Sequence, residues 1–196
     1  MATASAAGQI VGILLAAGRG SRFGGDKLLA HLDGERVGVT SCRHLLQAVP
    51  RVIAVVRPED SALAAALGAA GARIVRCPNA DIGMGASLAY GVKATPEAAG
   101  WIIALADMPW ILPATIASVA ACLTGGAFIA APFYQGTRGH PVLFSAACRE
   151  GLAMLDSDEG AKAVIEARRG DIVRIDVDDP GVLRDIDTPS DLPGAA

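Results

Sequence analysis

The sequence contains no hydrophobic run long enough to cross a bilayer, although 52% of its 196 residues are hydrophobic. A membrane-spanning helix needs roughly 20 consecutive apolar residues, and residues 1–8 lack the basic region and long apolar core of a secretory leader. Cysteine is also sparse, and no Cys-x-x-Cys pair occurs among Cys42, Cys77, Cys122 and Cys148. We therefore expect a cytoplasmic protein with reduced thiols and no membrane partner.

Positive charge is not in excess. The 17 Lys and Arg residues face 20 Asp and Glu residues, which gives a formal net charge of -3, and the cations are scattered along the chain. This balance argues against a nucleic-acid partner and favours a small anionic ligand that is held locally. The length fits one domain with a sizeable core, and we expect a flexible N-terminus over 1–8 and a single domain over 9–193.

Apolar runs of strand length alternate with helical segments along the chain. This order predicts a three-layer α/β/α, Rossmann-like fold with a mostly parallel sheet. The first run, Ile-Val-Gly-Ile-Leu-Leu, is apolar throughout, so we expect it in the centre of the sheet, covered on both faces. Strands are expected at 10–16, 51–56, 73–76, 101–106, 127–131, 141–144 and 171–177, and helices at 39–48, 61–70, 87–94, 113–123, 145–154 and 160–168.

The first strand leads into a loop in which glycines alternate with cations. Glycine permits positive φ angles and lets backbone N–H groups approach phosphate oxygens. Arg22 and Lys27 add positive charge where a triphosphate would lie. The loop therefore predicts a cradle for a nucleoside triphosphate; its glycines are Gly18, Gly20, Gly24 and Gly25.

Three better-known motifs do not fit this sequence. A dinucleotide-binding loop would need one residue fewer between the second and third glycines and an acid after the second strand, where Arg57 stands instead. A P-loop would need Ser or Thr after Lys27, but Leu28 follows. A nucleophile elbow would need a second glycine after Ser87.

The loop instead resembles the signature of nucleotidyltransferases: Leu-Ala-Ala-Gly, three variable residues, Arg, an apolar residue, Gly and then Lys. Over 11–192 the chain resembles the molybdenum cofactor cytidylyltransferases, which are related to the molybdenum cofactor guanylyltransferases. The resemblance implies a sheet of the nucleotide-diphospho-sugar transferase type and a Mg²⁺-dependent reaction. In that reaction CMP passes from CTP to the terminal phosphate of molybdenum cofactor (molybdopterin), pyrophosphate leaves, and the product serves a molybdenum hydroxylase or its maturation factor.

Two acidic segments are candidate metal ligands. Asp107 directly follows an apolar strand, where open α/β sheets bind ligands, in a Leu-Ala-Asp-Met-Pro sequence that resembles the family's metal-binding motif. The Asp-Ile-Asp-Thr-Pro segment resembles the typical ending of these cytidylyltransferases and places Asp185 and Asp187 on one face of an expected strand, before a helix start at Thr188. Asp187 is favoured because it abuts the turn, and capping roles are the alternative for these acids.

A further glycine-rich stretch, Gly-Met-Gly-Ala-Ser-Leu, resembles the part of the family that lies against the nucleotide. Ser87 is expected at a helix start beside free N–H groups, although a simple helix cap is the alternative. Guanylyl relatives tend to carry Leu-Ala-Gly-Gly in the first loop and Gly-Pro-Leu at this second position. Ala17 in the first loop and Gly83-Met84 in the second therefore both favour cytosine. The nucleotide-binding residues implied are Leu15, Ala16, Ala17, Gly18, Gly20, Lys27, Asn79, Gly83, Gly85 and Ser87.

The acceptor side is implied by Gly-His-Pro-Val, which contains His140 and follows Arg138. An acceptor phosphate is already ionised at pH 7 and needs no base, so His140 is expected to orient the substrate or support structure, with Arg138 binding phosphate. The family's next loop is matched less well, because Lys162 replaces its arginine. The implied catalytic residues are Arg22, Lys27 and Asp107. Four alternatives stay open: transfer to another phosphorylated acceptor, use of GTP, an FMN- or NADPH-dependent reductase, and a cofactor-carrying module.

Overall fold

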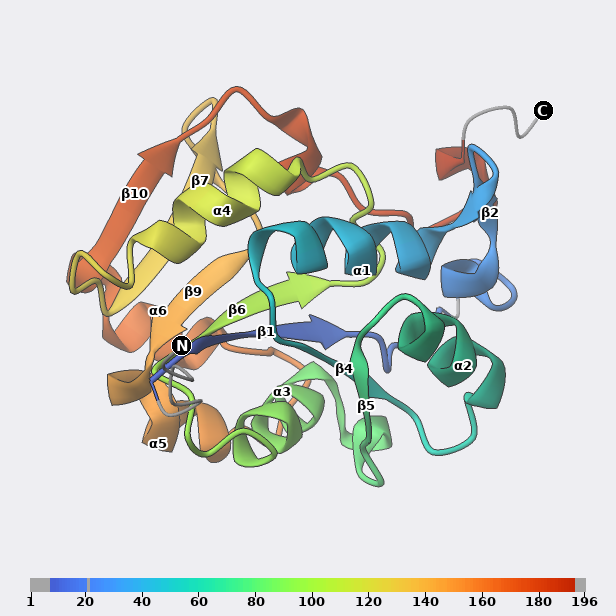
Figure 1. The fold of residues 1–196 in the computed structure, drawn as a ribbon, viewed down its shortest axis with the longest axis horizontal. Coiled ribbons are helices and arrows are strands. Elements are labelled where there is room, and N and C mark those ends of the chain that lie inside the picture. Colours follow the sequence, from blue (N-terminus) through green and yellow to red (C-terminus); the bar gives the residue numbers. More distant parts are fainter. Residues whose placement is uncertain (1–7, 21, 193–196) are drawn as a thin grey trace, which may run out of the picture.

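The computed structural model describes residues 8–20 and 22–192, so of the expected flexible N-terminus only Gly8 lies within it. Its centre is a sheet with the strand order β10-β7-β9-β6-β1-β4-β5 (Figure 1). Strand β8 pairs with β7 outside this path. The strands of this sheet are β1 (Ile10–Leu15), β4 (Val52–Val56), β5 (Arg73–Arg76), β6 (Gly100–Leu105), β7 (Ile129–Tyr134), β8 (Thr137–Arg138), β9 (Val142–Ser145) and β10 (Ile172–Asp176).

Most neighbouring strands run parallel, as the sequence predicts. β1 is parallel to both β4 and β6, with Leu15 opposite Val55 on one side and Leu105 on the other. β5 is parallel to β4, and β10 is parallel to β7. β9 is antiparallel to both of its neighbours, β6 and β7. The carboxyl ends of β1, β4 and β6 therefore meet along one edge.

Helices cover both faces of the sheet (Figure 1). Apolar side chains of α1, α2 and α4 join one buried cluster, and those of α3, α5 and α6 join another. The central strand feeds both clusters, since Leu14 belongs to the first and Ile13 and Leu15 belong to the second. The expected burial of this strand on two faces is confirmed. The helices are α1 (Val37–Ala48), α2 (Ser61–Ala69), α3 (Met84–Lys93), α4 (Pro113–Ala121), α5 (Arg149–Ala153) and α6 (Lys162–Ala167).

The structure differs from the sequence prediction at a few element boundaries. A hairpin of β2 (His31–Leu32) and β3 (Glu35–Arg36) was not anticipated; Asp33 and Gly34 form its turn with φ angles of 51° and 87°. Helix α3 starts three residues before Ser87, at Met84. The helix expected at 145–154 is reduced to α5, preceded by the 3-10 helix Ala146–Cys148.

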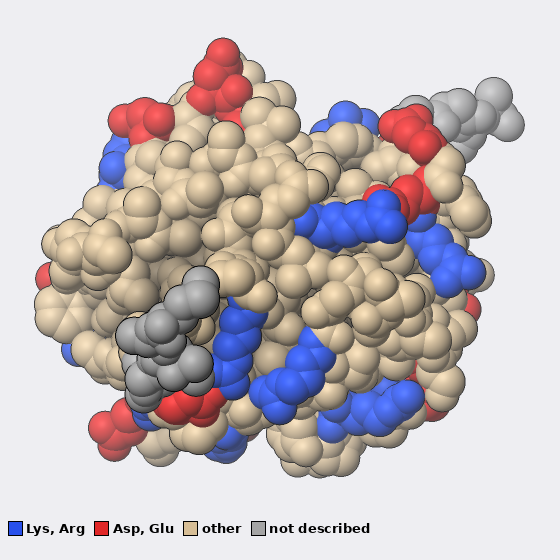
Figure 2. All heavy atoms as spheres, in the orientation of Figure 1, with Lys and Arg blue, Asp and Glu red and all other residues tan. Residues whose placement is uncertain are grey.

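Among the described residues no helix combines the length and the apolar character needed to cross a membrane. On the face drawn in Figure 2, Lys and Arg side chains lie in separate groups with uncharged surface between them.

Candidate active site

Three carboxylates converge at the carboxyl edge of the sheet. Asp107 follows β6, and Asp185 and Asp187 come from the C-terminal segment; one ligand atom from each lies within 4.8 Å of the others. The two segments are joined by the Ile186 N–H, which donates to the Asp107 carbonyl at 2.9 Å, and the Ile186 side chain is fully buried. The buried isoleucine thus orients its two acidic neighbours toward Asp107.

The C-terminal acids do not lie on a strand, so that part of the sequence prediction is wrong. Their expected common face is nevertheless present, because Asp185 and Asp187 both join Asp107 on either side of the buried Ile186. Burial, followed by the negative charge of Asp107, raises the pKa of Asp185 above its usual range. Thr188 precedes a 3-10 helix, Pro189–Asp191, rather than an α-helix.

Two cations contact this acidic cluster. Lys27, whose side chain is 10% exposed, places Nζ 2.6 Å from Asp107 Oδ2, 2.9 Å from the Ile186 carbonyl oxygen and 3.5 Å from Asp187 Oδ1. Arg22 Nη1 lies 2.5 Å from Asp187 Oδ2. Arg22, Lys27 and Asp107 are therefore brought together, although they are up to 85 positions apart in the sequence.

The donor set fits a hard divalent cation. Mg²⁺ and Mn²⁺ bind carboxylate oxygens and keep open positions for phosphate and water. Three converging carboxylates carry more negative charge than Lys27 and Arg22 offset, so the cluster retains a negative charge for such an ion. Asp107 and Asp187 are the expected ligands, and the geometry adds Asp185 to them.

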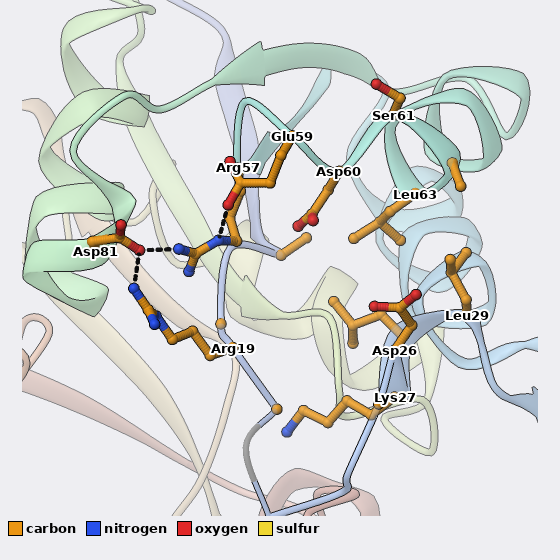
Figure 3. Close-up of a pocket in the computed structure, with 16 residues that line it drawn as sticks. Arg19, Asp26, Lys27, Leu29, Arg57, Glu59, Asp60, Ser61, Leu63 and Asp81 are labelled. Atoms are coloured by element: carbon orange, nitrogen blue, oxygen red, sulfur yellow. Dashed lines mark hydrogen bonds and ion pairs between the residues drawn. The ribbon is translucent and has the colours of Figure 1, made fainter.

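The glycine loop lines a cavity of about 650 Å³ together with Lys27, the lysine that contacts this cluster (Figure 3). Gly20 and Gly24 have positive φ angles of 57° and 76°, as the sequence predicts, while Gly18 and Gly25 do not. Of the expected nucleotide-binding residues, Ala16, Gly18, Gly20 and Lys27 line this cavity.

The opposite wall of this cavity is acidic. It carries Glu59 and Asp60, and burial followed by the charge of Glu59 raises the pKa of Asp60. Arg19 and Lys27 lie on the loop side of the cavity, so positive charge is available there for an anionic group.

A second cavity of about 410 Å³ lies between the end of β1 and the start of α3. Ser87, which is 3% exposed, lines it together with Asp107 and Asp158. Asp107 of the acidic cluster therefore lines a concave cavity whose walls are partly polar and partly apolar. Leu15, Ala17, Gly18, Gly83 and Ser87, all expected at the nucleotide, line it as well.

The start of α3 departs from expectation, because its first two N–H groups already have partners within the chain. The Gly85 N–H donates to the Ser157 carbonyl oxygen at 2.8 Å, and the Met84 N–H lies 3.5 Å from Asp158 Oδ1. A Cβ at Gly85 would come 2.6 Å from the Ser157 oxygen. The glycine therefore accommodates the chain's own 157–158 segment, a contact that sequence reasoning missed.

Asn79 is also placed differently. It is exposed, it directly precedes the 3-10 helix Ala80–Ile82, and it does not line either of these two cavities. The structure therefore does not bring Asn79 to the other expected nucleotide-binding residues.

Arg138 and His140 line a third, smaller cavity of about 190 Å³, together with Glu159 and Lys162. Burial, followed by the positive charge of Arg138, lowers the pKa of His140 to about 4. His140 is consequently neutral at pH 7, and its buried Nδ1 has no hydrogen-bond partner among the described residues. A neutral imidazole fits the expected orienting or structural role better than a charge-bearing one.

A charged network between the first two cavities was not anticipated. Arg57, only 8% exposed, contacts the carboxylates of Glu59 and Asp81, and Arg19 meets Asp81 at 2.8 Å (Figure 3). The signal in the sequence is a cation directly after a buried strand, at the edge where ligands bind.

The site combines a glycine loop, a convergent acidic cluster and paired cations at the carboxyl edge of a mostly parallel sheet. These features are typical of a nucleotide-binding α/β protein. The chain belongs to the family of MobA-like NTP transferase domains, whose profile matches residues 12–172.

Two curated relatives resemble this chain over nearly its whole length. The purine catabolism protein PucB of Bacillus subtilis (strain 168) is 30% identical, with 93% of each chain covered. The nicotine blue oxidoreductase of Paenarthrobacter nicotinovorans is 27% identical, with 91% of this chain and 92% of that protein covered.

A solved structure shares the fold. Rv0371c from Mycobacterium tuberculosis H37Rv superimposes with a TM-score of 0.81 at 29% identity, covering 94% of this chain and 96% of that one. The same protein in complex with manganese gives a TM-score of 0.74 at 26% identity, covering 87% and 89%.

Proposed function

We propose that the protein transfers CMP from CTP to the terminal phosphate of molybdenum cofactor, releasing pyrophosphate, with Mg²⁺ as the metal. The observation that carries this proposal is the cluster of Asp107, Asp185 and Asp187 beside Lys27 and the glycine loop. The product would serve the maturation of a molybdenum hydroxylase, with that enzyme or its maturation factor as the partner.

The reaction is an in-line displacement at the α-phosphorus of CTP. An oxygen of the acceptor phosphate forms a bond to the α-phosphorus while the bond to the β-phosphate oxygen breaks, and pyrophosphate carries away the electron pair. Bound at Asp107 and Asp187, Mg²⁺ would neutralise charge that develops on the α-phosphate. Lys27 and Arg22 would exchange their carboxylate contacts for phosphate and, together with the loop N–H groups, bind the β- and γ-phosphates.

Substrate selection rests on the two smaller cavities. We assign the second cavity, between the end of β1 and the start of α3, to the nucleoside and call it the nucleoside cavity. Ala17, Gly83 and Met84, the residues that favour cytosine, line it. Arg138 and Lys162 supply positive charge at the third cavity, which suits an acceptor phosphate, while neutral His140 orients it. Catalysis is then mainly positioning and electrostatic stabilisation.

The test is pyrophosphate release by the purified protein with molybdenum cofactor and either CTP or GTP. We expect release with CTP and Mg²⁺, and a loss of at least about a hundredfold in Asp107→Asn. The matched control is Asp176→Asn, an exposed aspartate at the end of β10. Equal rates of pyrophosphate release by Asp107→Asn and the control would contradict the proposal. Faster release with GTP than with CTP would show that the transferred group is GMP instead of CMP.

A reductase is the second candidate, because one relative is named an oxidoreductase at 27% identity. It predicts saturable binding of FMN or NADPH. Binding of neither, together with Mg²⁺-dependent binding of CTP, would exclude it in favour of nucleotidyl transfer.

A further inference from the structure

Arg57 is a buried cation that the proposed chemistry does not use. It directly follows β4 and is 8% exposed. Its guanidinium contacts its own segment and two distant ones: Nε donates to Glu59 Oε1 at 2.8 Å, Nη1 donates to the Ala17 carbonyl oxygen at 3.3 Å, and Nη2 contacts Asp81 Oδ1. One rigid side chain thus joins the end of β4 to the glycine loop and to the segment before α3.

The same group stands between the two larger cavities. Both are lined by Arg57 and Asp81, together with Gly18, Arg19 and Leu28. In Figure 3 the Arg57 side chain extends from the end of β4 toward Asp81, and Arg19 meets the same carboxylate from the loop side. The position of Arg57 therefore fixes one boundary of the space that we assign to the nucleoside.

The contact with Ala17 distinguishes this arrangement from an ordinary surface ion pair. Glu59 and Asp81 are 63% and 61% exposed, so their pairing with Arg57 is partly screened by water. The Ala17 carbonyl, by contrast, lies on a residue that is 6% exposed and lines the nucleoside cavity. A guanidinium can hold this carbonyl and a carboxylate at once, because its N–H donors point in different directions within one rigid plane.

We infer that Arg57 is a positioning residue for nucleotide recognition, which holds the Ala17 carbonyl and Asp81 at a fixed separation and so sets the width of the nucleoside cavity. The inference rests on the proposed function, since it needs a nucleoside triphosphate in that cavity. A lysine in this position would keep the charge but lose the fork that spans the two partners.

The test compares Arg57→Gln, Arg57→Lys and Asp81→Asn with Arg73→Gln. The control arginine starts β5, is exposed and donates to the Ala94 carbonyl oxygen. Dissociation constants for CTP and GTP with Mg²⁺ are measured by calorimetry, kcat and KM by pyrophosphate release, and Tm by circular dichroism.

We expect Arg57→Gln to weaken CTP binding about tenfold and to reduce discrimination against GTP, with kcat at saturation within about threefold of wild type. Arg57→Lys should recover part of the affinity. Asp81→Asn should weaken CTP binding in the same direction, and the double variant Arg57→Gln/Asp81→Asn should bind no more weakly than Arg57→Gln alone. Arg73→Gln should bind CTP as wild type does.

Two different failures can be told apart. A wild-type protein that binds no nucleoside triphosphate overturns the proposed function and this inference with it. A wild-type protein that binds CTP, beside folded variants at Arg57 and Asp81 that bind it equally well, overturns the role of Arg57 alone. A lower Tm with unchanged CTP affinity would assign Arg57 to structure only. If Arg57→Gln does not fold, Arg57→Lys and Asp81→Asn decide the question.

Discussion

Replacing Lys27 by Met would separate two opposite effects of its ammonium group. Lys27 Nζ lies 2.6 Å from Asp107 Oδ2 and 3.5 Å from Asp187 Oδ1, so it occupies carboxylate oxygens that a divalent metal would also bind. Met keeps most of the buried stem and removes the charge. We therefore expect Lys27→Met to bind metal more tightly without nucleotide and yet to turn over more slowly.

The magnitudes follow from the geometry. A unit charge and a divalent cation about 4 Å apart repel each other by about 8 kcal/mol at an effective dielectric constant of about 20, twice the value for two unit charges. The flexible stem lets the ammonium retreat from an incoming ion, so only part of this repulsion is felt. We expect about 1.4 kcal/mol, which is a tenfold gain in Mn²⁺ affinity. Turnover should fall about 10²- to 10³-fold, the usual loss when one charge-stabilising donor is removed from a transition state.

The assay is a Mn²⁺ titration followed by electron paramagnetic resonance, paired with steady-state pyrophosphate release. Lys93→Met, at the exposed end of α3, is the control for loss of one lysine charge. A kcat for Lys27→Met within about threefold of wild type would refute a transition-state role for Lys27. Weaker Mn²⁺ binding by this variant would refute the competition between the ammonium and the metal.

Three further predictions concern pH, packing and thiol access. Because the pKa of His140 is lowered from 6.5 to about 4, the unfolded state binds more protons in that interval. The free energy of unfolding should therefore fall as the pH drops from 6.5 to 4, by at most about 3 kcal/mol, and urea unfolding of His140→Gln should show a flatter profile. Gly85→Ala should lower the free energy of unfolding by about 1–3 kcal/mol, because its Cβ would meet the Ser157 oxygen at 2.6 Å, whereas Gly18→Ala, whose Cβ meets nothing within 4 Å, should leave it unchanged in the same urea series. A thiol reagent should label Cys122 first, since the other cysteines are buried, and peptide mapping after partial labelling checks this order.

Much of the fold could be predicted because the requirement to bury apolar residues leaves a clear pattern in the sequence of each strand. The all-apolar β1 must be covered on both faces of the sheet. Asp107 follows an apolar strand, at the carboxyl edge of the sheet where ligands bind. The hairpin at 31–36 escaped prediction because its strands have two residues each, although Asp33-Gly34 is a known turn signal.

The rest of the site depends on contacts between distant segments. Nothing near Gly85 in the sequence indicates that Ser157 approaches its backbone, so the α3 N–H groups could not be recognised as occupied. Two of the partners of Arg57, Ala17 and Asp81, likewise come from segments that are distant in the sequence. Periodicity describes one segment at a time and cannot supply such pairings.

The most direct test of a metal-assisted nucleotidyl site is thermal stabilisation of the purified protein by CTP, GTP, ATP, NADPH and FMN, each with and without Mg²⁺. A ligand that binds the native state raises the Tm by mass action. We predict the largest shift with CTP, dependent on Mg²⁺ and lost in Asp107→Asn. A shift with FMN or NADPH alone, or a CTP shift that Asp107→Asn retains in full, would contradict the account.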